Sequence, residues 1–138
     1  MENEHIHVLT APNDLLREIN IVDTPGTNAV IREHEVITSE FVPRADLVLF
    51  ITSSDRPFTE SERTFLEMIR GWGKKVVVVL NKIDILQSEE DLREVQEYVE
   101  SNFQKHLGLT PEIFPVSVRN ALRAKLGEPA LWGASRFE

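Results

Sequence analysis

The stretch KVVVVLNKID, residues 75–84, joins an uninterrupted apolar run to a short polar motif. Such a run is typical of a strand that is buried on both faces of a parallel sheet. In sheets of this kind ligands bind at the carboxyl ends of the strands, and the motif Asn81-Lys82-Ile83-Asp84 follows the apolar run directly. The order of these residues therefore predicts a core strand that leads into a ligand-binding loop.

Strands and helices are predicted to alternate on both sides of this stretch. Further buried strands are expected at ADLVLFIT (45–52) and EIFPVS (112–117), and helices at 29–41, 59–70, 88–107 and from 118 onward. Thr59 with Glu62 three residues later forms a capping box, and Ser88 is expected to cap the helix that follows it. This alternation predicts an α/β fold, in which helices cover both faces of a parallel sheet.

Two short apolar segments near the start of the chain are expected to pair with each other. HIHVL (5–9) and REINIV (17–22) flank a turn-forming stretch that contains Pro-Asn-Asp. This arrangement predicts an antiparallel hairpin. Because Val22 closes an apolar run, the residues from Asp23 onward would extend from the end of a strand.

The overall composition disfavours several classes of function. The chain has 138 residues and a formal net charge of −8, which argues against a nucleic-acid-binding surface and a polybasic membrane patch. It contains no cysteine, so neither disulfides nor thiolate metal sites can form. Neither a membrane-spanning stretch nor a signal peptide is recognisable, and we therefore expect one cytoplasmic domain without a nucleic-acid partner.

Asn81, Lys82 and Asp84 form the most informative motif. A guanine ring presents N1–H and N2–H₂ as adjacent donors, and a fixed carboxylate such as Asp84 can accept both. Asn81 would contact the N7/O6 edge and tie neighbouring loops together, while the Lys82 stem would lie along the face of the base. These common residues would also suit a polar turn, but the buried strand before them and the order of the other loops favour a guanine site.

The segment Asp23-Thr24-Pro25-Gly26 is predicted to face the phosphates of the same nucleotide. Asp23 would reach a Mg²⁺ ion through a water molecule, because a hard carboxylate suits that ion. Gly26 would let the backbone N–H approach a γ-phosphate closely, and Pro25 would stiffen the loop. Taken alone, these four residues are better explained as a Pro-Gly turn that ends a strand.

A third loop follows the strand EIFPVS, at Ser117-Val118-Arg119. The backbone N–H of Val118 could donate to guanine O6, a contact in which the identity of the side chain matters little. Ser117 could instead be the N-cap of the next helix, and the two roles are compatible. The parallel-sheet prediction places this loop beside the other two, on one edge that a single ligand can touch.

These three loops resemble the third, fourth and fifth motifs of the P-loop GTPases. VDTPGTN, FVPRADLVLFITSSDRPFTESE, VVLNKIDIL and the terminal SRFE look, more narrowly, like the bacterial dynamin-like GTPases. The resemblance covers nearly all of residues 1–138, which would form the C-terminal part of a dynamin-type G domain. It implies GTP or GDP and Mg²⁺ as cofactors, and a parent protein that remodels membranes and forms homodimers through its G domains. The parent protein would act at the surface of a membrane, and its membrane contacts would come from regions outside this chain.

The main departure from this family is the lack of a phosphate-binding loop, since the pattern G-x-x-x-x-G-K-[ST] occurs nowhere in the sequence. In the family, the strand that leads into this loop lies in the middle of the sheet. We therefore expect a P-loop GTPase-like three-layer sandwich, mostly parallel with an antiparallel N-terminal hairpin, and incomplete because the central first strand is missing. The chain alone is expected to be inactive as a GTPase.

Two alternatives remain open at this point. An Era-like translational or ribosome-assembly GTPase shares D-T-P-G and N-K-x-D, but the segment SDRPFTESE and the SRF ending argue against it. A non-enzymatic interaction module, the product of a split gene, would instead bind a partner that supplies the missing strand.

Overall fold

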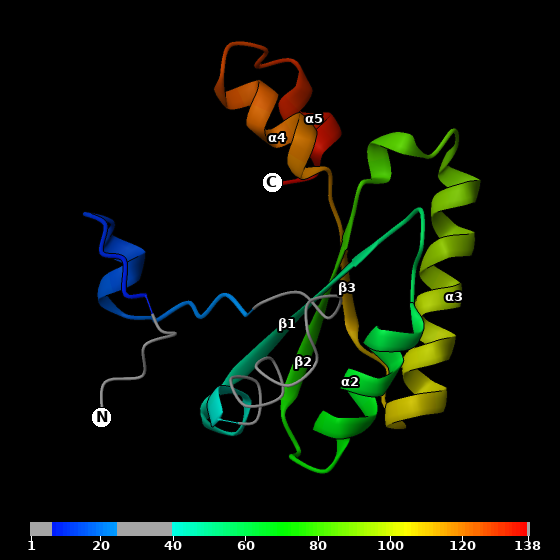
Figure 1. Ribbon diagram of the computed structural model, residues 1–138. Helices are drawn as coiled ribbons and strands as arrows, with labels where there is room; N and C mark the ends of the chain where they lie inside the picture. The colour runs from blue at the N-terminus through cyan, green and yellow to red at the C-terminus, as the bar shows by residue number, and fades with distance from the viewer. Residues whose placement is uncertain (1–6, 25–39, 138) are drawn as a thin grey trace.

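The computed structural model describes residues 7–24 and 40–137, and its centre is a parallel three-stranded sheet. The strands are β1 (Leu47–Ser53), β2 (Lys75–Asn81) and β3 (Glu112–Pro115), in the spatial order β1-β2-β3 (Figure 1). Both neighbouring pairs are parallel, as the alternation of strands and helices predicts. The α/β class and the three expected buried-type strands are therefore confirmed in position and direction.

The register of the sheet aligns apolar residues of neighbouring strands. Val48 pairs with Val76 and Phe50 with Val78, so these four side chains lie on one face of the sheet. β2 is the middle strand, and its apolar run is the most completely buried of the three. Because β2 ends at Asn81, the loop predicted to bind a ligand starts at the centre of the carboxyl edge of the sheet.

Two helices, α2 (Glu60–Arg70) and α3 (Glu89–Leu107), begin where the sequence predicts. Thr59 and Ser88 each accept a hydrogen bond from the backbone of the third helical residue, whose carboxylate accepts one from the cap in return. Gly108 caps the C-terminus of α3, and its φ of 72° is a left-handed conformation that favours glycine. The shorter 3-10 turns in this part of the chain are η2 (Val42–Arg44) and η3 (Ile83–Ile85).

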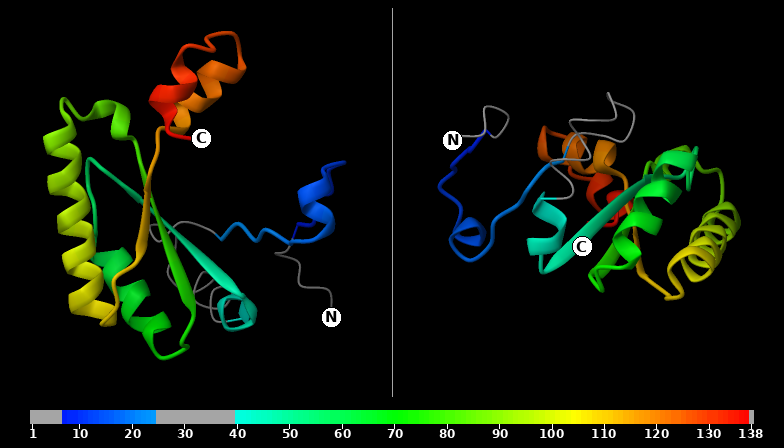
Figure 2. Two further views of the ribbon diagram at one scale, coloured as in Figure 1. Left: turned by 180° about the vertical axis from the view of Figure 1, so that it is seen from behind. Right: turned by 60° about the horizontal axis from the view of Figure 1, so that its bottom comes forward.

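The hydrophobic core lies between the sheet and α2 and α3, which cover the same face (Figure 1, Figure 2). Phe103 meets the rings of Phe50 and Phe58 edge-to-face, at centroid distances of 5.4 and 5.3 Å. The large apolar side chains that are fully buried here are Phe58, Leu66, Ile69, Val78, Leu80, Val99 and Phe103. This layer fixes the position of β2 and of the loop that follows it.

The opposite face of the sheet is covered by no helix of the described residues. Leu47, Leu49 and Ile51 of β1 are 45%, 56% and 63% exposed, so the prediction that this strand is buried on both faces is wrong. The last two helices, α4 (Val118–Lys125) and α5 (Leu131–Ser135), lie beyond the carboxyl ends of the strands (Figure 1, Figure 2). The described residues therefore form two layers where three are predicted, because α4 and α5 do not pack on the second face.

Residues 7–24 contain no β-strand, so the predicted antiparallel hairpin is wrong in this part of the chain. Their regular element is a 3-10 turn, η1 (Asp14–Arg17), which begins after Asn13, whose side chain accepts the N–H of Leu15. Every residue of 7–24 is exposed, so no described element buries its apolar side chains. A two-stranded hairpin without such packing is only marginally stable in water, which explains why the local turn prevails.

Several predicted features lie outside the described residues. They are Pro25, Gly26, the beginning of the first hairpin strand and nearly all of the helix expected at 29–41. Within 7–24 and 40–137, no helix combines the length and the apolar character needed to cross a membrane.

Candidate functional site

The loops that follow β1, β2 and β3 meet at the carboxyl edge of the sheet. The N–H of Ser54, just after β1, donates to the carbonyl oxygen of Asn81 at 3.0 Å. The N–H of Ile83 donates to the carbonyl oxygen of Val116, just after β3, at 3.3 Å. These bonds hold the loops together at the edge where ligands of parallel sheets bind. We call residues 53–55, 81–84 and 116–119 the strand-end rim.

Asn81 joins the second and third loops of the strand-end rim. Its Oδ1 accepts the N–H of Lys82 at 2.8 Å and the N–H of Val118 at 3.1 Å. This use of the oxygen leaves the amide NH₂ group as the part of Asn81 that can donate to a ligand. The Val118 N–H, which the sequence predicts as a donor to guanine O6, is engaged with Asn81, so an O6 contact would have to share or replace this bond.

Asp84 is held from two sides. Its Oδ1 accepts the hydroxyl hydrogen of Ser117 at 2.6 Å, and the guanidinium of Arg119 lies 3.8 Å from Oδ2. The side chain of Asp84 is 13% exposed and that of Arg119 is 72% exposed, so the serine is the stronger constraint. A carboxylate fixed in this way can accept two parallel N–H donors from a planar ligand.

Ser117 is fully buried and has two roles at once. Its Oγ accepts the N–H of Asn120 at 3.1 Å, which is the geometry of an N-cap of α4. The same hydroxyl donates to Asp84, so the cap and the contact with the carboxylate coexist. The backbone N–H of Ser117 donates to the carbonyl oxygen of Ser135 at 2.9 Å, which ties the rim to the end of α5.

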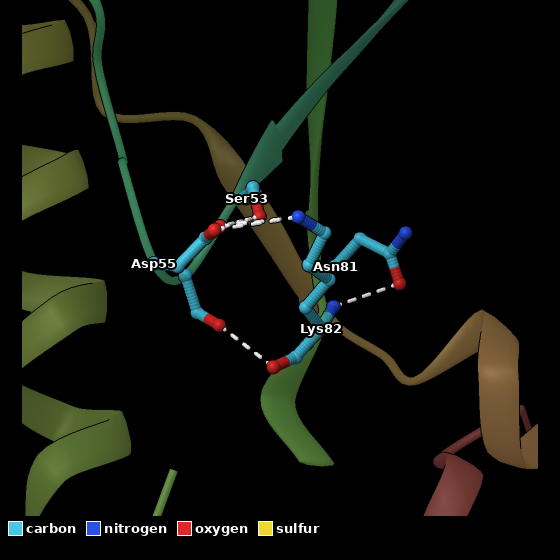
Figure 3. A network of polar contacts seen from close by, with 5 residues as sticks. Ser53, Asp55, Asn81 and Lys82 are labelled. Carbon is cyan, nitrogen blue, oxygen red and sulfur yellow. Dashed lines mark hydrogen bonds and ion pairs between the residues drawn. The ribbon is translucent and has the colours of Figure 1, made fainter. Parts of the chain in front are cut away.

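Lys82 is anchored at both ends. Its backbone has a φ of 64°, a left-handed conformation uncommon for a residue with a side chain, and its carbonyl oxygen accepts the hydroxyl of Ser54 at 2.7 Å. Its Nζ lies 3.4 Å from the carboxylate of Asp55 (Figure 3). A hydrogen bond from Ser53, and after it the Lys82 ammonium group, holds the pKa of the Asp55 carboxyl below its usual range. The lysine stem is therefore held between the loops after β1 and β2.

The predicted phosphate-side residues are not connected to the strand-end rim. Asp23 and Thr24 are exposed, and no hydrogen bond or ion pair of the described residues joins them to the rim. In the described part of the chain, no group of three or more His, Asp or Glu side chains is arranged to hold a metal ion. Because Mg²⁺ requires several oxygen ligands in octahedral geometry, the single exposed carboxylate of Asp23 does not by itself fit this ion.

Asp55 and Ser135 are among the contributors to the rim that are not assigned a role from the sequence. Asp55 stands shortly before α2, where acidic residues are already explained by the helix dipole. Ser135 belongs to the SRFE ending, which resembles the family but suggests no function for the serine. Neither residue stands in a spacing pattern that marks it, since each acts through a contact with a distant loop.

Comparisons with known proteins agree with this architecture. A family model described as "Dynamin family" matches residues 1–83. The protein named "Probable transmembrane GTPase FZO-like, chloroplastic" of Arabidopsis thaliana is 45% identical over 138 residues, which are 99% of this chain and 15% of that protein. Dynamin-like protein 1 of Campylobacter jejuni is 30% identical over 95 residues, which are 67% of this chain and 13% of that protein.

The fold is also similar to that of solved structures. The apo form of translation elongation factor SelB from Methanococcus maripaludis superposes with a TM-score of 0.57 at 21% identity, over 80% of this chain and 24% of that one. At this identity the likeness concerns the fold alone. This chain spans only 15% and 13% of the lengths of the Arabidopsis and Campylobacter relatives.

Proposed function

The chain belongs to the dynamin family as a portion of its GTPase domain, and from this premise we propose that it forms the guanine-recognising side of that domain. Asp84 accepts N1–H and N2–H₂ of the base, and the amide NH₂ of Asn81 donates to the N7/O6 edge. The stem of Lys82 lies along the base, while Ser117, Val118 and Arg119 close the third side. The nucleotide is GTP or GDP.

The observation that carries this proposal is the hydrogen-bonded geometry of the rim. The bond between Ser117 and Asp84 (2.6 Å) and the bond between Asn81 and Val118 (3.1 Å) orient the polar groups without a ligand. A site whose side chains are already ordered loses less conformational entropy when a ligand binds. The Ser117 hydroxyl also restrains the orientation of the carboxylate that would accept the two guanine donors.

We assign hydrolysis only to the complete domain. Asp23, Thr24, Pro25 and Gly26 would face the phosphates there, with Asp23 reaching Mg²⁺ through a water molecule, but the described residues alone do not fit the ion. Phosphoryl transfer depends on positioning and charge stabilisation of the transferred group, for which the sequence offers no glycine-rich loop. Homodimer formation and membrane action are likewise proposed for a longer protein and not for this segment.

Substitution of Asp84 tests the base-recognition role. In a form of the protein that also carries a phosphate-binding loop, Asp84→Asn should weaken GTP binding and favour xanthosine triphosphate, whose 2-oxo group accepts a donor. Charge-assisted hydrogen bonds contribute about 1.5–3 kcal/mol each, so the affinity for GTP should fall roughly tenfold to several hundredfold. Calorimetric titration with both nucleotides measures the change, and an unaltered GTP affinity would refute the assignment.

A second candidate, a non-enzymatic interaction module, is favoured by the bare face of β1. Leu49 and Ile51 are more than half exposed on that face, although they belong to the apolar run of a parallel strand. A partner that adds a strand beside β1 and covers this face would bury them. The test is amide exchange at β1 in the presence of flanking segments of the Arabidopsis relative. Slower exchange supports the module, and unchanged exchange argues against it.

The Era-like alternative is not favoured, since the dynamin family model matches residues 1–83 of the chain.

A further inference from the structure

Two fully buried serines, Ser117 and Ser135, connect the end of the chain to the strand-end rim. The N–H of Ser117 donates to the carbonyl oxygen of Ser135 at 2.9 Å. Both residues are 0% exposed, which is unusual for polar side chains and requires that their polar atoms be paired. The contact crosses from the first residue before α4 to the last residue of α5.

The position of Ser117 determines the position of Asp84. The Ser117 hydroxyl donates to Asp84 Oδ1 at 2.6 Å, and the next backbone N–H, that of Val118, donates to Asn81 at 3.1 Å. Any displacement of the Ser117 backbone therefore moves both groups that are proposed to contact guanine. The bond from Ser117 to Ser135 is the contact that restrains this backbone from the side of α5.

Ser135 is itself held in a closed turn. Its Oγ donates to the carbonyl oxygen of Trp132 at 2.5 Å and accepts the N–H of Phe137 at 3.3 Å. The next residue, Arg136, reverses the chain with a φ of 57° and forms an ion pair with Glu89 at 2.5 Å. Because the side chain of Ser135 is fully buried, a larger side chain there would displace the end of α5 and with it the carbonyl oxygen that accepts the Ser117 N–H.

We propose that Ser135 is a positioning residue for base recognition: its carbonyl oxygen fixes Ser117, which in turn fixes the carboxylate of Asp84. This inference rests on the proposed guanine site and extends it to a residue that never touches the nucleotide. Base selectivity then depends on the SRFE ending of the chain, because a change there is transmitted to Asp84 through two hydrogen bonds.

Amide hydrogen exchange of residues 1–138 tests the coupling without any nucleotide. Ser135→Leu forces α5 away from Ser117, and the Ser117 amide should then exchange roughly tenfold faster, as expected when one buried hydrogen bond is lost. Ser135→Ala keeps the carbonyl oxygen and fits the space, so protection of Ser117 should remain. Glu89→Gln, which weakens the surface ion pair with Arg136, is the matched control and should leave Ser117 unchanged. If Ser135→Leu does not fold, Ser135→Val replaces it.

Binding of GMP and IMP, followed by NMR at millimolar concentration, tests the consequence for the base. The two ligands carry the same phosphate, and IMP lacks the 2-amino group, so their affinity ratio reports on Asp84 alone. The wild-type chain should prefer GMP roughly tenfold, and Ser135→Leu should reduce this preference at least about threefold, while Ser135→Ala retains it. If Ser135 had only a structural role, Ser135→Leu would weaken the binding of GMP and of IMP equally and leave the ratio of their affinities unchanged.

The outcomes separate this inference from the proposed function. If the wild-type chain binds neither ligand, the guanine site fails, and the exchange of Ser117 alone decides whether Ser135 restrains it. If Ser135→Leu keeps both the protection of Ser117 and the preference for GMP, the positioning role is overturned. It is also overturned if Glu89→Gln reduces the preference as strongly as Ser135→Leu does.

Discussion

The strand-end rim and the N-terminal segment 7–24 differ in how far their residues are buried and in whether their hydrogen bonds reach distant parts of the chain. In the rim, Ser117 is fully buried and Asp84 is 13% exposed, and hydrogen bonds join three separate loops. In residues 7–24 every residue is exposed, and the hydrogen bonds described there are local, such as that from Leu15 to Asn13. The part of the proposed nucleotide site that would contact the base is thus held by contacts within this chain, whereas Asp23 and Thr24 of the proposed phosphate side are not.

The difference follows from where each region finds its partners. The rim is built from consecutive β–α units whose strands pair with each other, so its loops are positioned by the same core that stabilises the fold. Ile19, Ile21 and Val22 can be buried only against a further strand or helix, and all three remain 42–66% exposed. A pair of short strands without a packed apolar face is only marginally stable in water, and the segment forms the local turn η1 instead.

The largest effect expected from this contrast is that residues 1–138 alone neither bind GTP with micromolar affinity nor hydrolyse it, and that binding through the base contacts alone is no tighter than millimolar. Most of the charge of a nucleoside triphosphate lies on its phosphates, which require backbone N–H groups, a lysine and Mg²⁺. Removal of an activating arginine alone costs about 10³–10⁵ in rate, and here the whole phosphate-binding loop is missing from the sequence. Calorimetry with GTP and a phosphate-release assay on the purified chain should show neither micromolar binding nor turnover.

The control for this prediction is a form extended upstream through a phosphate-binding loop, which should gain binding. A micromolar dissociation constant or magnesium-dependent turnover for residues 1–138 would mean that the phosphate site lies elsewhere in the chain. It would also remove the contrast between the two regions, because both halves of the site would then be functional without further sequence.

The next largest effect is expected for Phe103→Ala in the core below the rim. Phe103 is fully buried and meets Phe50 and Phe58 edge-to-face, so the truncation leaves a cavity. The free energy of unfolding should fall by about 3–5 kcal/mol, as for other buried phenylalanines. Urea unfolding measures the change, with Tyr98→Ala on the exposed side of α3 as the control that should stay within about 0.5 kcal/mol. If both variants lose the same free energy of unfolding, Phe103 does not lie in the hydrophobic core.

A smaller effect is expected for Asn81→Ala at the rim. The substitution removes Oδ1 and leaves the N–H groups of Lys82 and Val118 without their acceptor, which should cost about 1–3 kcal/mol of unfolding free energy. Asn81→Asp keeps an acceptor oxygen and should cost less. If the two variants unfold at the same urea concentration, the Asn81 oxygen does not join the loops in solution.

The sequence predicts the features of this molecule that depend on a local pattern of residues. The three strands, the caps at Thr59 and Ser88 and the ends of β2 and β3 all follow from periodicity and capping rules. The hairpin and the burial of β1 on both faces are wrong, because an apolar run shows only that a strand can be buried. Asp55 is missed because its role depends on a contact with Lys82, 27 positions away, and Ser135 is missed because it acts on Ser117, 18 positions away, through its carbonyl oxygen.

A still smaller effect is expected for Ile21→Ser in the N-terminal segment. Ile21 is 66% exposed, so the substitution removes little buried apolar surface, and the free energy of unfolding should change by no more than about 0.5 kcal/mol. Urea unfolding of the variant and of the wild-type chain provides the measurement. A loss of more than about 1.5 kcal/mol of unfolding free energy would show that this segment packs on the rest of the protein. The segment would then not differ from the rim in this respect.

The smallest effect concerns acid and the contact between Lys82 and Asp55. The hydrogen bond from Ser53, and then the Lys82 ammonium, lowers the pKa of Asp55 below its ordinary value of 3.8, which means that folding favours the ionised carboxylate. The resulting stabilisation is present at neutral pH and is lost only as the pH falls below 3.8 through the pKa of the folded state. NMR titration of the Asp55 carboxyl carbon should show this lowered pKa, and Ser53→Ala should raise it toward the ordinary value.

The contact contributes little to stability at neutral pH, because the side chains of Lys82 and Asp55 are largely in contact with water. Thermal unfolding between pH 5 and pH 8 should therefore be nearly the same for Asp55→Asn and the wild-type chain. A large difference in stability between the two proteins in that range would mean that the Lys82–Asp55 pair contributes far more than a solvent-exposed pair allows.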